Sequence, residues 1–391
     1  MKAVDSDYDF SEVHASLDKY VEDDLLAMAA AVVLDGKAVV DFHMVGHQDR
    51  EAECAIQADS IYRIYSSTKL ITSCAAMMLW EEDAFRLDDP LQTYLPELGS
   101  LKVLKDGAGD ASLVEPVAVE PTIRQLMSHN AGFSYGLFAE SVVDPLYNEA
   151  GVSAPTSTLE DMVRKLADIP LAYQPGQRWQ YSVSADVLGR LIEVLSGQSF
   201  GEFLSRRIFE PLGMTDTGFF VPEEKRERIV SIYTTVDGKL ARFDETVIAQ
   251  RLPNNYLEWW AKDSDKIALG GAGIVSTAYD YAQFLQMLVN KGNLDGKRIL
   301  GRKTVEMLSR GLYSESTDAT TAIGLSVSVV TGAQKHYHPE SEGTFTWGGY
   351  FYTSFWVDPQ EKFVGVLMSQ INPAQTRLDG QFKIMAYSAL E

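Results

Sequence analysis

A serine and a lysine stand three positions apart, at Ser66 and Lys69, just before an apolar stretch that begins at Leu70. If this segment is the first turn of a helix, residues i and i+3 lie on one face, so the hydroxyl and the amine become neighbours. A serine hydroxyl is a weak nucleophile until a nearby base removes its proton, which an amine can do. The spacing favours an activated serine nucleophile, but a pattern this short also occurs by chance.

A tyrosine further along the chain could complete such a site. Tyr181 follows the turn signal Pro175-Gly176 and precedes a helical stripe of apolar residues. We therefore expect Tyr181 on a loop at a helix entrance, where Ser182 or Ser184 could cap the helix. A phenolate held there could take the serine proton, as could the lysine, and the sequence does not decide which of them is the base at each step.

A glycine-rich segment near the C-terminus supplies a third motif. Trp347-Gly348-Gly349 ends one predicted strand just before the next one begins. Paired glycines at such a place let a ligand approach the backbone closely. Three motifs in this order are far more specific than any one of them alone.

The segments around the motifs predict a sheet that is assembled from both ends of the chain. Near the N-terminus, two apolar runs flank Asp35-Gly36, which is a strong signal for a two-residue hairpin. The C-terminal part is rich in β-branched and aromatic runs, whereas the middle of the chain is richer in helix caps. The predicted strands cover residues 27–34, 38–45, 322–330, 343–347, 351–357 and 363–369.

These elements predict an α/β fold of the α+β type, with an antiparallel sheet flanked by helices and an inserted, mainly helical region. The sheet domain would comprise residues 1–75 and 270–391, and the helical domain residues 76–269. We expect the active site in the cleft between them. Thr277 is predicted to cap one helix of the sheet domain, and residues 378–390 to form a closing helix.

The composition disfavours several classes of partner. The chain has 34 Lys and Arg against 55 Asp and Glu, a formal net charge of −21, so its surface repels phosphate backbones and anionic lipid. We expect no nucleic-acid and no membrane partner, since no apolar run approaches the roughly 18 residues that span a bilayer. The first residues lack the basic-then-apolar order of a signal peptide, which predicts a cytoplasmic protein. The sequence leaves room for a homo-oligomer.

A rival nucleophile occurs at Ser134, in the pattern G-x-S-x-G of residues 132–136. A nucleophile elbow needs a strand before it and a helix after it, whereas a short predicted helix precedes this pattern. We therefore interpret the segment as a loop that lines the cleft, with Phe133 and Tyr135 in contact with the substrate.

We expect no metal and no cofactor. His336 and His338 alternate along one predicted strand and His43 and His47 lie near another, but neither pair has a third ligand at a useful spacing. The aromatic residues within 256–260 could either wall an acyl pocket or belong to the core.

The ordered motifs resemble those of the class C β-lactamase-like serine hydrolases. The surrounding residues 62–66, 125–132 and 270–277 are similar as well, and the resemblance runs from about residue 10 to the C-terminus. Within this superfamily the chain is most similar to the family VIII carboxylesterases, which carry Trp-Gly-Gly as the third motif.

The resemblance implies a role for each motif residue. Ser66 would be the nucleophile, with Lys69 and Tyr181 as its bases. The backbone N–H groups of Ser66 and Tyr350 would stabilise the oxyanion, and Trp347-Gly348-Gly349 would bind the substrate.

Two departures from the β-lactamase pattern favour an uncharged substrate. The β-lactamases usually have Asn where this chain has Val183, and Lys where it has Trp347, so partners for an anionic β-lactam are missing. We therefore predict a serine carboxylesterase that hydrolyses short- to medium-chain carboxylic esters through an acyl-Ser66 intermediate. The alternatives are a β-lactamase or D-amino-acid peptidase or amidase, an acyltransferase, and a catalytically silent binding protein.

Overall fold

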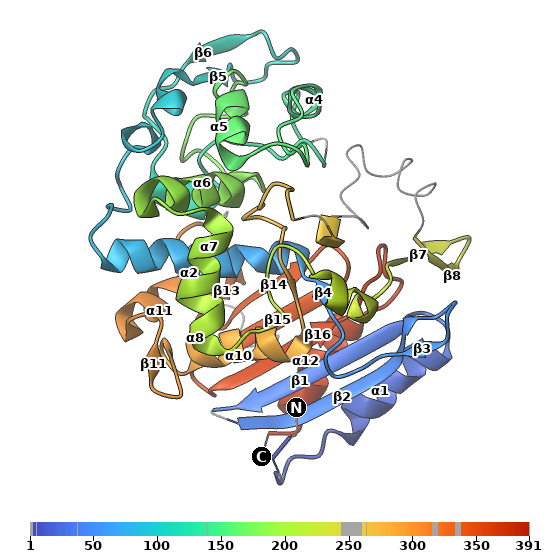
Figure 1. Ribbon diagram of the computed structural model, residues 1–391. Helices are drawn as coiled ribbons and strands as arrows, with labels where there is room; N and C mark the ends of the chain where they lie inside the picture. The colour runs from blue at the N-terminus through green and yellow to red at the C-terminus, as the bar shows by residue number, and fades with distance from the viewer. Residues whose placement is uncertain are drawn as a thin grey trace.

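The computed structural model describes residues 3–390 apart from 5, 37, 139, 244–259, 263, 315–319 and 333–337. Among these residues, an eight-stranded sheet runs in the order β12-β13-β14-β15-β16-β1-β2-β3, and every neighbouring pair is antiparallel (Figure 1). Its strands are β1 Met28–Asp35, β2 Ala38–Asp49, β3 Cys54–Ala55, β12 Thr321–Ile323, β13 Ser328–Val330, β14 Phe345–Gly349, β15 Thr353–Asp358 and β16 Phe363–Met368. The prediction of an antiparallel sheet built from both termini is confirmed.

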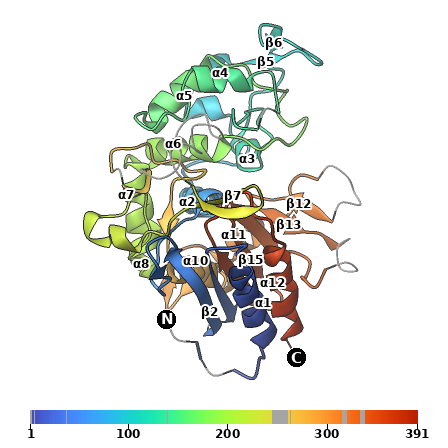
Figure 2. The same cartoon turned by 90° about the vertical axis from the view of Figure 1, so that its right-hand side faces the viewer.

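Helices cover both faces of this sheet. On one face α1 (Ser11–Glu22) packs against α12 (Leu378–Ser388), and on the other lies α10 (Ala278–Val289), as Figures 1 and 2 show. Strand β15 contacts both layers because successive side chains point to opposite faces. Phe355 lies 5.5 Å from Tyr281 of α10, whereas Trp356 lies 4.9 Å from Phe382 of α12, both measured between ring centroids.

The hairpin prediction at Asp35-Gly36 is confirmed, since Asp35 pairs with Ala38 across the turn. The single strand predicted over 322–330 is wrong. The chain turns back between β12 and β13, where the Gly324 N–H donates to the Val327 carbonyl and Ser326 has a φ of +67°. The apolar run hides this turn because its residues are buried on both sides of it.

The middle of the chain forms a mainly helical region, whose first part lies above the sheet in Figure 1 and whose later part runs down beside the sheet. Its helices are α3 Ile123–Met127, α4 Asp144–Glu149, α5 Leu159–Ala167, α6 Ser184–Ser196, α7 Phe200–Leu204 and α8 Glu210–Leu212. Two hairpins accompany them, formed by β5 Lys102–Leu104 with β6 Val114–Pro116 and by β7 Tyr233–Val236 with β8 Lys239–Arg242. The domain boundary at residue 270 and the cleft stay predictions. Residues 256–259 lie outside the described residues, as does the side chain of residue 260.

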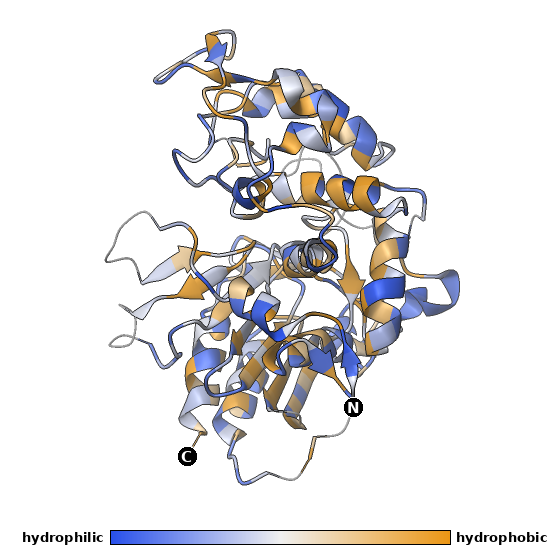
Figure 3. Cartoon of the chain, turned by 90° about the vertical axis from the view of Figure 1, so that its left-hand side faces the viewer, coloured by the Kyte–Doolittle hydropathy of each residue, from blue (hydrophilic) through white to orange (hydrophobic). Residues whose placement is uncertain are grey.

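One helix connects the two regions. Helix α2 (Thr68–Glu81) packs against α6, and its residues from Thr68 to Leu79 are all buried. In Figure 3 hydrophobic residues gather on the central strands of the sheet. None of the helices in the described parts of the chain is long and apolar enough to cross a membrane.

The remaining elements are short. They are β4 Tyr62–Arg63, which pairs with β9 Val275–Ser276, β10 Asn293–Leu294, which pairs with β11 Lys297–Arg298, and α11 Arg302–Leu308. Thr277 caps α10 as predicted, since its hydroxyl accepts a hydrogen bond from the N–H of Asp280 at 3.0 Å.

Candidate active site

Ser66 lies in a 3-10 turn, Tyr65–Ser67, which leads from β4 directly into α2. The predicted helix start is therefore correct, although its first turn is tighter than an α-helix. Tyr65 has a φ of +44°, a left-handed conformation that is strained for a large side chain. This bend immediately precedes Ser66, whose side chain is half-buried while its neighbours Tyr65 and Ser67 are buried.

Lys69 lies one turn further along and is fully buried, at 0% exposed. Its Nζ is 3.2 Å from the Ser66 Oγ and 2.7 Å from the carbonyl oxygen of Gly271. It also lies 4.5 Å from the centre of the Tyr181 ring. A buried amine needs such polar partners, so these contacts fix Lys69 beside the serine hydroxyl.

Tyr181 lies on the loop just before α6, as predicted, and its hydroxyl donates to the Ser66 Oγ at 2.7 Å. The structure thus brings Ser66, Lys69 and Tyr181 together from two elements that are far apart in the sequence. One hydroxyl contacts both an amine and a phenol, which is the geometry that serine activation requires.

The predicted cap by Ser182 or Ser184 is wrong, because α6 begins without a side-chain cap. The two hydroxyls instead bond to each other at 2.7 Å, and the Ser182 hydroxyl bonds to the Nδ1 of His129 at 3.0 Å. His129 is 1% exposed, and burial together with the charge of Lys69 lowers the pKa of His129 to about 3. A neutral imidazole therefore lies behind Tyr181, at 5.1 Å between ring centroids.

Aromatic rings surround Tyr181. The Tyr135 ring stacks on it at 5.4 Å and 12°, and the Trp347 indole lies 5.8 Å away. Tyr135 and Trp347 are half-buried and keep surface that a substrate could contact. Phe133 differs, because it is 1% exposed and packs in the hydrophobic core, which leaves it almost no surface for a substrate.

Ser134 has a structural environment. It is 1% exposed, its hydroxyl donates to the carboxylate of Asp144, and it accepts a hydrogen bond from the Gln180 amide at 2.7 Å. These bonds anchor the loop that presents Tyr135.

The glycines of the third motif allow β14 to lie against the turn that contains Ser66. A Cβ on Gly349 would be 2.3 Å from the carbonyl oxygen of Ile64, two residues before the serine, and a Cβ on Gly348 would be 2.8 Å from the Thr353 carbonyl. Only glycine fits at such approaches. Tyr350, the predicted oxyanion residue, comes directly after Gly349 at the end of β14, so its backbone lies near the turn that contains Ser66.

Sequence reasoning missed two residues behind the lysine. Gly271 accepts the Lys69 hydrogen bond, and Asp186, in the first turn of α6, accepts from the Gly271 N–H at 2.8 Å. Burial raises the pKa of Asp186 to about 6, while the nearby charge of Lys69 opposes that rise. The Gly-Gly pair at residues 270 and 271 was a signal for close packing that the sequence did carry.

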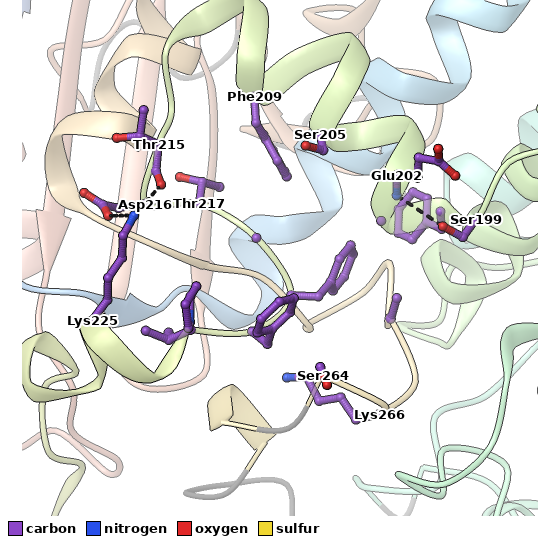
Figure 4. A pocket seen from close by; sticks show the side chains of 18 of the residues that line it. Ser199, Glu202, Ser205, Phe209, Thr215, Asp216, Thr217, Lys225, Ser264 and Lys266 are labelled. Carbon is purple, nitrogen blue, oxygen red and sulfur yellow. Dashed lines mark hydrogen bonds and ion pairs between the residues drawn. The ribbon is translucent and has the colours of Figure 1, made fainter.

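Other parts of the described chain do not compete for this role. No three His, Cys, Asp or Glu residues are grouped there as a metal would require, and His336 lies outside the described residues. A cavity of about 520 Å³ lies beside α7 and includes Phe209, Asp216 and Lys225 in its lining (Figure 4). Neither Ser66 nor Tyr181 lines it, so we place the candidate site at the serine.

A serine hydroxyl held by a buried lysine and a tyrosine, in a fold whose helices flank an antiparallel sheet, defines a serine hydrolase. The chain belongs to the Beta-lactamase family, whose sequence profile matches residues 13–387. The sequence-based prediction of a β-lactamase-like serine hydrolase is confirmed.

Known relatives include two enzymes named as esterases. Lovastatin esterase of Penicillium rubens is 29% identical over 329 residues, which cover 79% of this chain and 79% of that protein. Esterase EstB of Burkholderia gladioli is 28% identical over 364 residues, covering 89% and 87% of the two chains. The solved structure of EstCE1, "a hydrolase with promiscuous acyltransferase activity", matches with a TM-score of 0.80 at 24% identity, covering 97% of this chain and 98% of that one.

Proposed function

We propose that this protein is a carboxylesterase that hydrolyses uncharged short- to medium-chain carboxylic esters through an acyl-Ser66 intermediate. The observation that carries the proposal is the pair of contacts on the Ser66 Oγ, from Lys69 at 3.2 Å and Tyr181 at 2.7 Å. The names of the relatives lovastatin esterase and EstB support ester substrates.

In the proposed reaction, the Ser66 Oγ attacks the ester carbonyl carbon while its proton passes to Tyr181 or Lys69. The carbonyl oxygen becomes an oxyanion, which the N–H groups of Ser66 and Tyr350 would stabilise. Collapse of this intermediate breaks the bond to the alcohol oxygen, and the alcohol leaves with the proton. Water then attacks the acyl-serine and gives a proton to the same base. The bond between the acyl carbon and the Ser66 Oγ breaks, the base returns the proton to the Ser66 Oγ, and the carboxylic acid leaves.

The local side chains favour an ester over a β-lactam. Val183 is 0% exposed, so the position that usually carries an amide has no polar group to offer a substrate. Trp347 supplies a half-buried indole where a cation would anchor a carboxylate. An anionic β-lactam would leave its charge unpaired at this site, which costs binding energy, whereas an uncharged ester would not.

A substrate panel tests this proposal. The panel contains nitrophenyl esters of about two to eight acyl carbons, which a small apolar pocket can hold. We expect their kcat/KM to lie well above that for nitrocefin or a D-alanyl amide. Nitrocefin turnover as efficient as that of the best ester would contradict the ester assignment. A fluorophosphonate should label Ser66 covalently, which a silent binding protein would not permit.

Acyl transfer is the second candidate, because the described activity of the structural neighbour EstCE1 includes it. Adding an alcohol during turnover of a nitrophenyl ester distinguishes the two activities. A hydrolase releases mainly the free acid, whereas an acyltransferase releases mainly the new ester of the added alcohol.

A further inference from the structure

Asp186 is a buried carboxyl group that the proposed reaction does not use directly. It lies in the first turn of α6, five residues after Tyr181, and is 2% exposed. Burying a carboxylate is costly unless hydrogen bonds and an opposite charge compensate. Asp186 has both, since the Gly271 N–H donates to it at 2.8 Å and Lys69 favours its anionic form whenever the lysine is protonated.

Gly271 connects this carboxyl group to the lysine. Its N–H bonds to Asp186, and its carbonyl oxygen accepts the hydrogen bond from the Lys69 Nζ at 2.7 Å. One residue thus contacts Asp186 on α6 and Lys69 on α2. The groups that act on the Asp186 carboxyl are therefore Lys69 from α2 and the backbone N–H groups of Gly271 and of Asp186 itself.

The segment that carries Gly271 has little freedom to move. A Cβ on Gly270 would be 2.3 Å from the carbonyl oxygen of Ala185, and a Cβ on Gly271 would be 2.9 Å from the Asp186 carboxylate. From the other side, the Thr72 hydroxyl of α2 donates to the Gly270 carbonyl at 2.7 Å. The glycine pair is held between α2, which carries Lys69, and α6, which begins just after Tyr181.

We propose that Asp186 is a positioning residue for the acylation step, acting through Gly271 on Lys69. Its carboxylate orients Gly271 so that the Gly271 carbonyl holds the Lys69 amine beside the Ser66 Oγ. Its negative charge also favours the ammonium that forms when Lys69 receives the serine proton. Asp186 itself gains and loses no proton in the cycle, because that proton passes on to the departing alcohol. This inference rests on the proposed function of Ser66 and Lys69.

The substitution Asp186→Asn tests the role of the charge, because the amide keeps the size and an oxygen acceptor for the Gly271 N–H. We expect kcat for a nitrophenyl ester to fall about 10- to 100-fold, the size of effect known for residues that orient metal ligands through a hydrogen bond, with KM changed less than about twofold. The rate at which a fluorophosphonate labels Ser66 should fall by the same factor. The acid limb of the kcat/KM profile should move to lower pH, because the charge that favours the ammonium is gone.

Asp280→Asn is the matched control. Asp280 is also a buried carboxyl group that accepts a backbone N–H, from Asp216 at 2.8 Å, but it lies on α10 and contacts neither Lys69 nor Gly271 in the described structure. We expect this variant to keep the wild-type pH profile and labelling rate.

The outcomes separate this inference from the proposed function. If Ser66→Ala is inactive but folded Asp186→Asn keeps the wild-type kcat and pH profile, the inference is overturned while the function stands. If Ser66→Ala keeps its activity, both are overturned. Asp186→Glu, which keeps the charge, serves where the Asn variant does not fold, and should retain the pH profile. Failure of both variants to fold, judged by circular dichroism, would show a purely structural residue and would also overturn the inference.

Discussion

Two serines in this molecule each lie in a sequence pattern that can mark a nucleophile, but their surroundings are opposite. Ser66 is half-buried and its hydroxyl contacts an amine and a phenol, both of which can exchange protons. Ser134 is 1% exposed and its hydroxyl contacts a carboxylate and an amide, which hold it in place. The difference shows that the partners and the access of a hydroxyl, more than its sequence pattern, indicate a nucleophile.

The largest expected effect comes from exchanging the two serines for alanine. Ser66→Ala should lower kcat by about 10⁴-fold or more, because the nucleophile is removed. Ser134→Ala should keep kcat per folded molecule within about tenfold, while it lowers the free energy of unfolding by about 1–3 kcal/mol, because Asp144 and Gln180 each lose a hydrogen-bond partner. Ester hydrolysis and urea denaturation measure the two quantities. Loss of activity in a fully folded Ser134→Ala variant would erase the contrast.

The Tyr181 hydroxyl that contacts Ser66 can be removed while the Tyr181 ring is kept. Tyr181→Phe should reduce kcat by about 10²- to 10⁴-fold with little change in KM, because the ring still stacks on Tyr135 but has no hydroxyl to take a proton. Tyr135→Phe is the control and should reduce kcat by less than about tenfold. Steady-state kinetics on one nitrophenyl ester compare both variants, and equal effects would place the two phenols in equivalent roles.

His129 makes the environment of Ser66 sensitive to acid. Its pKa is about 3 in the folded protein, against 6.5 for an ordinary histidine, so the unfolded chain binds the extra proton between these values. Stability from this residue is therefore present above pH 6.5 and is lost as the pH falls, with a slope that approaches about 1.4 kcal/mol per pH unit. Urea denaturation between pH 7 and about pH 4 should show that the free energy of unfolding depends less on pH in His129→Gln than in the wild type. Parallel curves for the two proteins would contradict this assignment.

The smallest effect is expected at Trp347, whose indole lies beside Tyr181 and therefore near Ser66. Trp347→Ala should raise KM for a medium-chain ester by about 2- to 13-fold and leave kcat nearly unchanged, since the loss of an aromatic contact costs about 0.5–1.5 kcal/mol. The increase should be smaller for an acetyl ester, which reaches less of the indole. An equal increase for both esters would place Trp347 away from the acyl chain.

Local patterns predicted much of this fold and the central part of the site. The alternation of the strands, the Asp35-Gly36 turn and the i, i+3 spacing of Ser66 and Lys69 are all properties of short segments. The prediction of the α6 cap was wrong because contacts with residues far away in the sequence determine the hydrogen bonds there. Ser182 bonds to His129 and to Ser184, and neither serine caps α6, because a buried imidazole from another segment needs a partner.

Other features could not be read from the sequence at all. The bond between Asp186 and Gly271 joins residues 85 positions apart, and no local signal specifies such a pairing. The burial of Phe133 depends in the same way on the core that forms around it. The roles of the catalytic residues follow from the resemblance to the family and from geometry together, and they stay proposals until the variants are measured.

The pairing of β1 with β16 has a consequence for synthesis on the ribosome. Ala30 lies opposite Met368, so the apolar strand β1 has no β16 partner until the 338 residues from Ala30 to Met368 have been added (368 − 30). At about 5–20 residues per second, this interval lasts roughly 20–70 s. The hairpin with β2 shields only one edge of β1 during that time. The nascent chain therefore exposes an aggregation-prone strand edge, so its yield should depend on chaperones and on temperature more than its final stability would suggest.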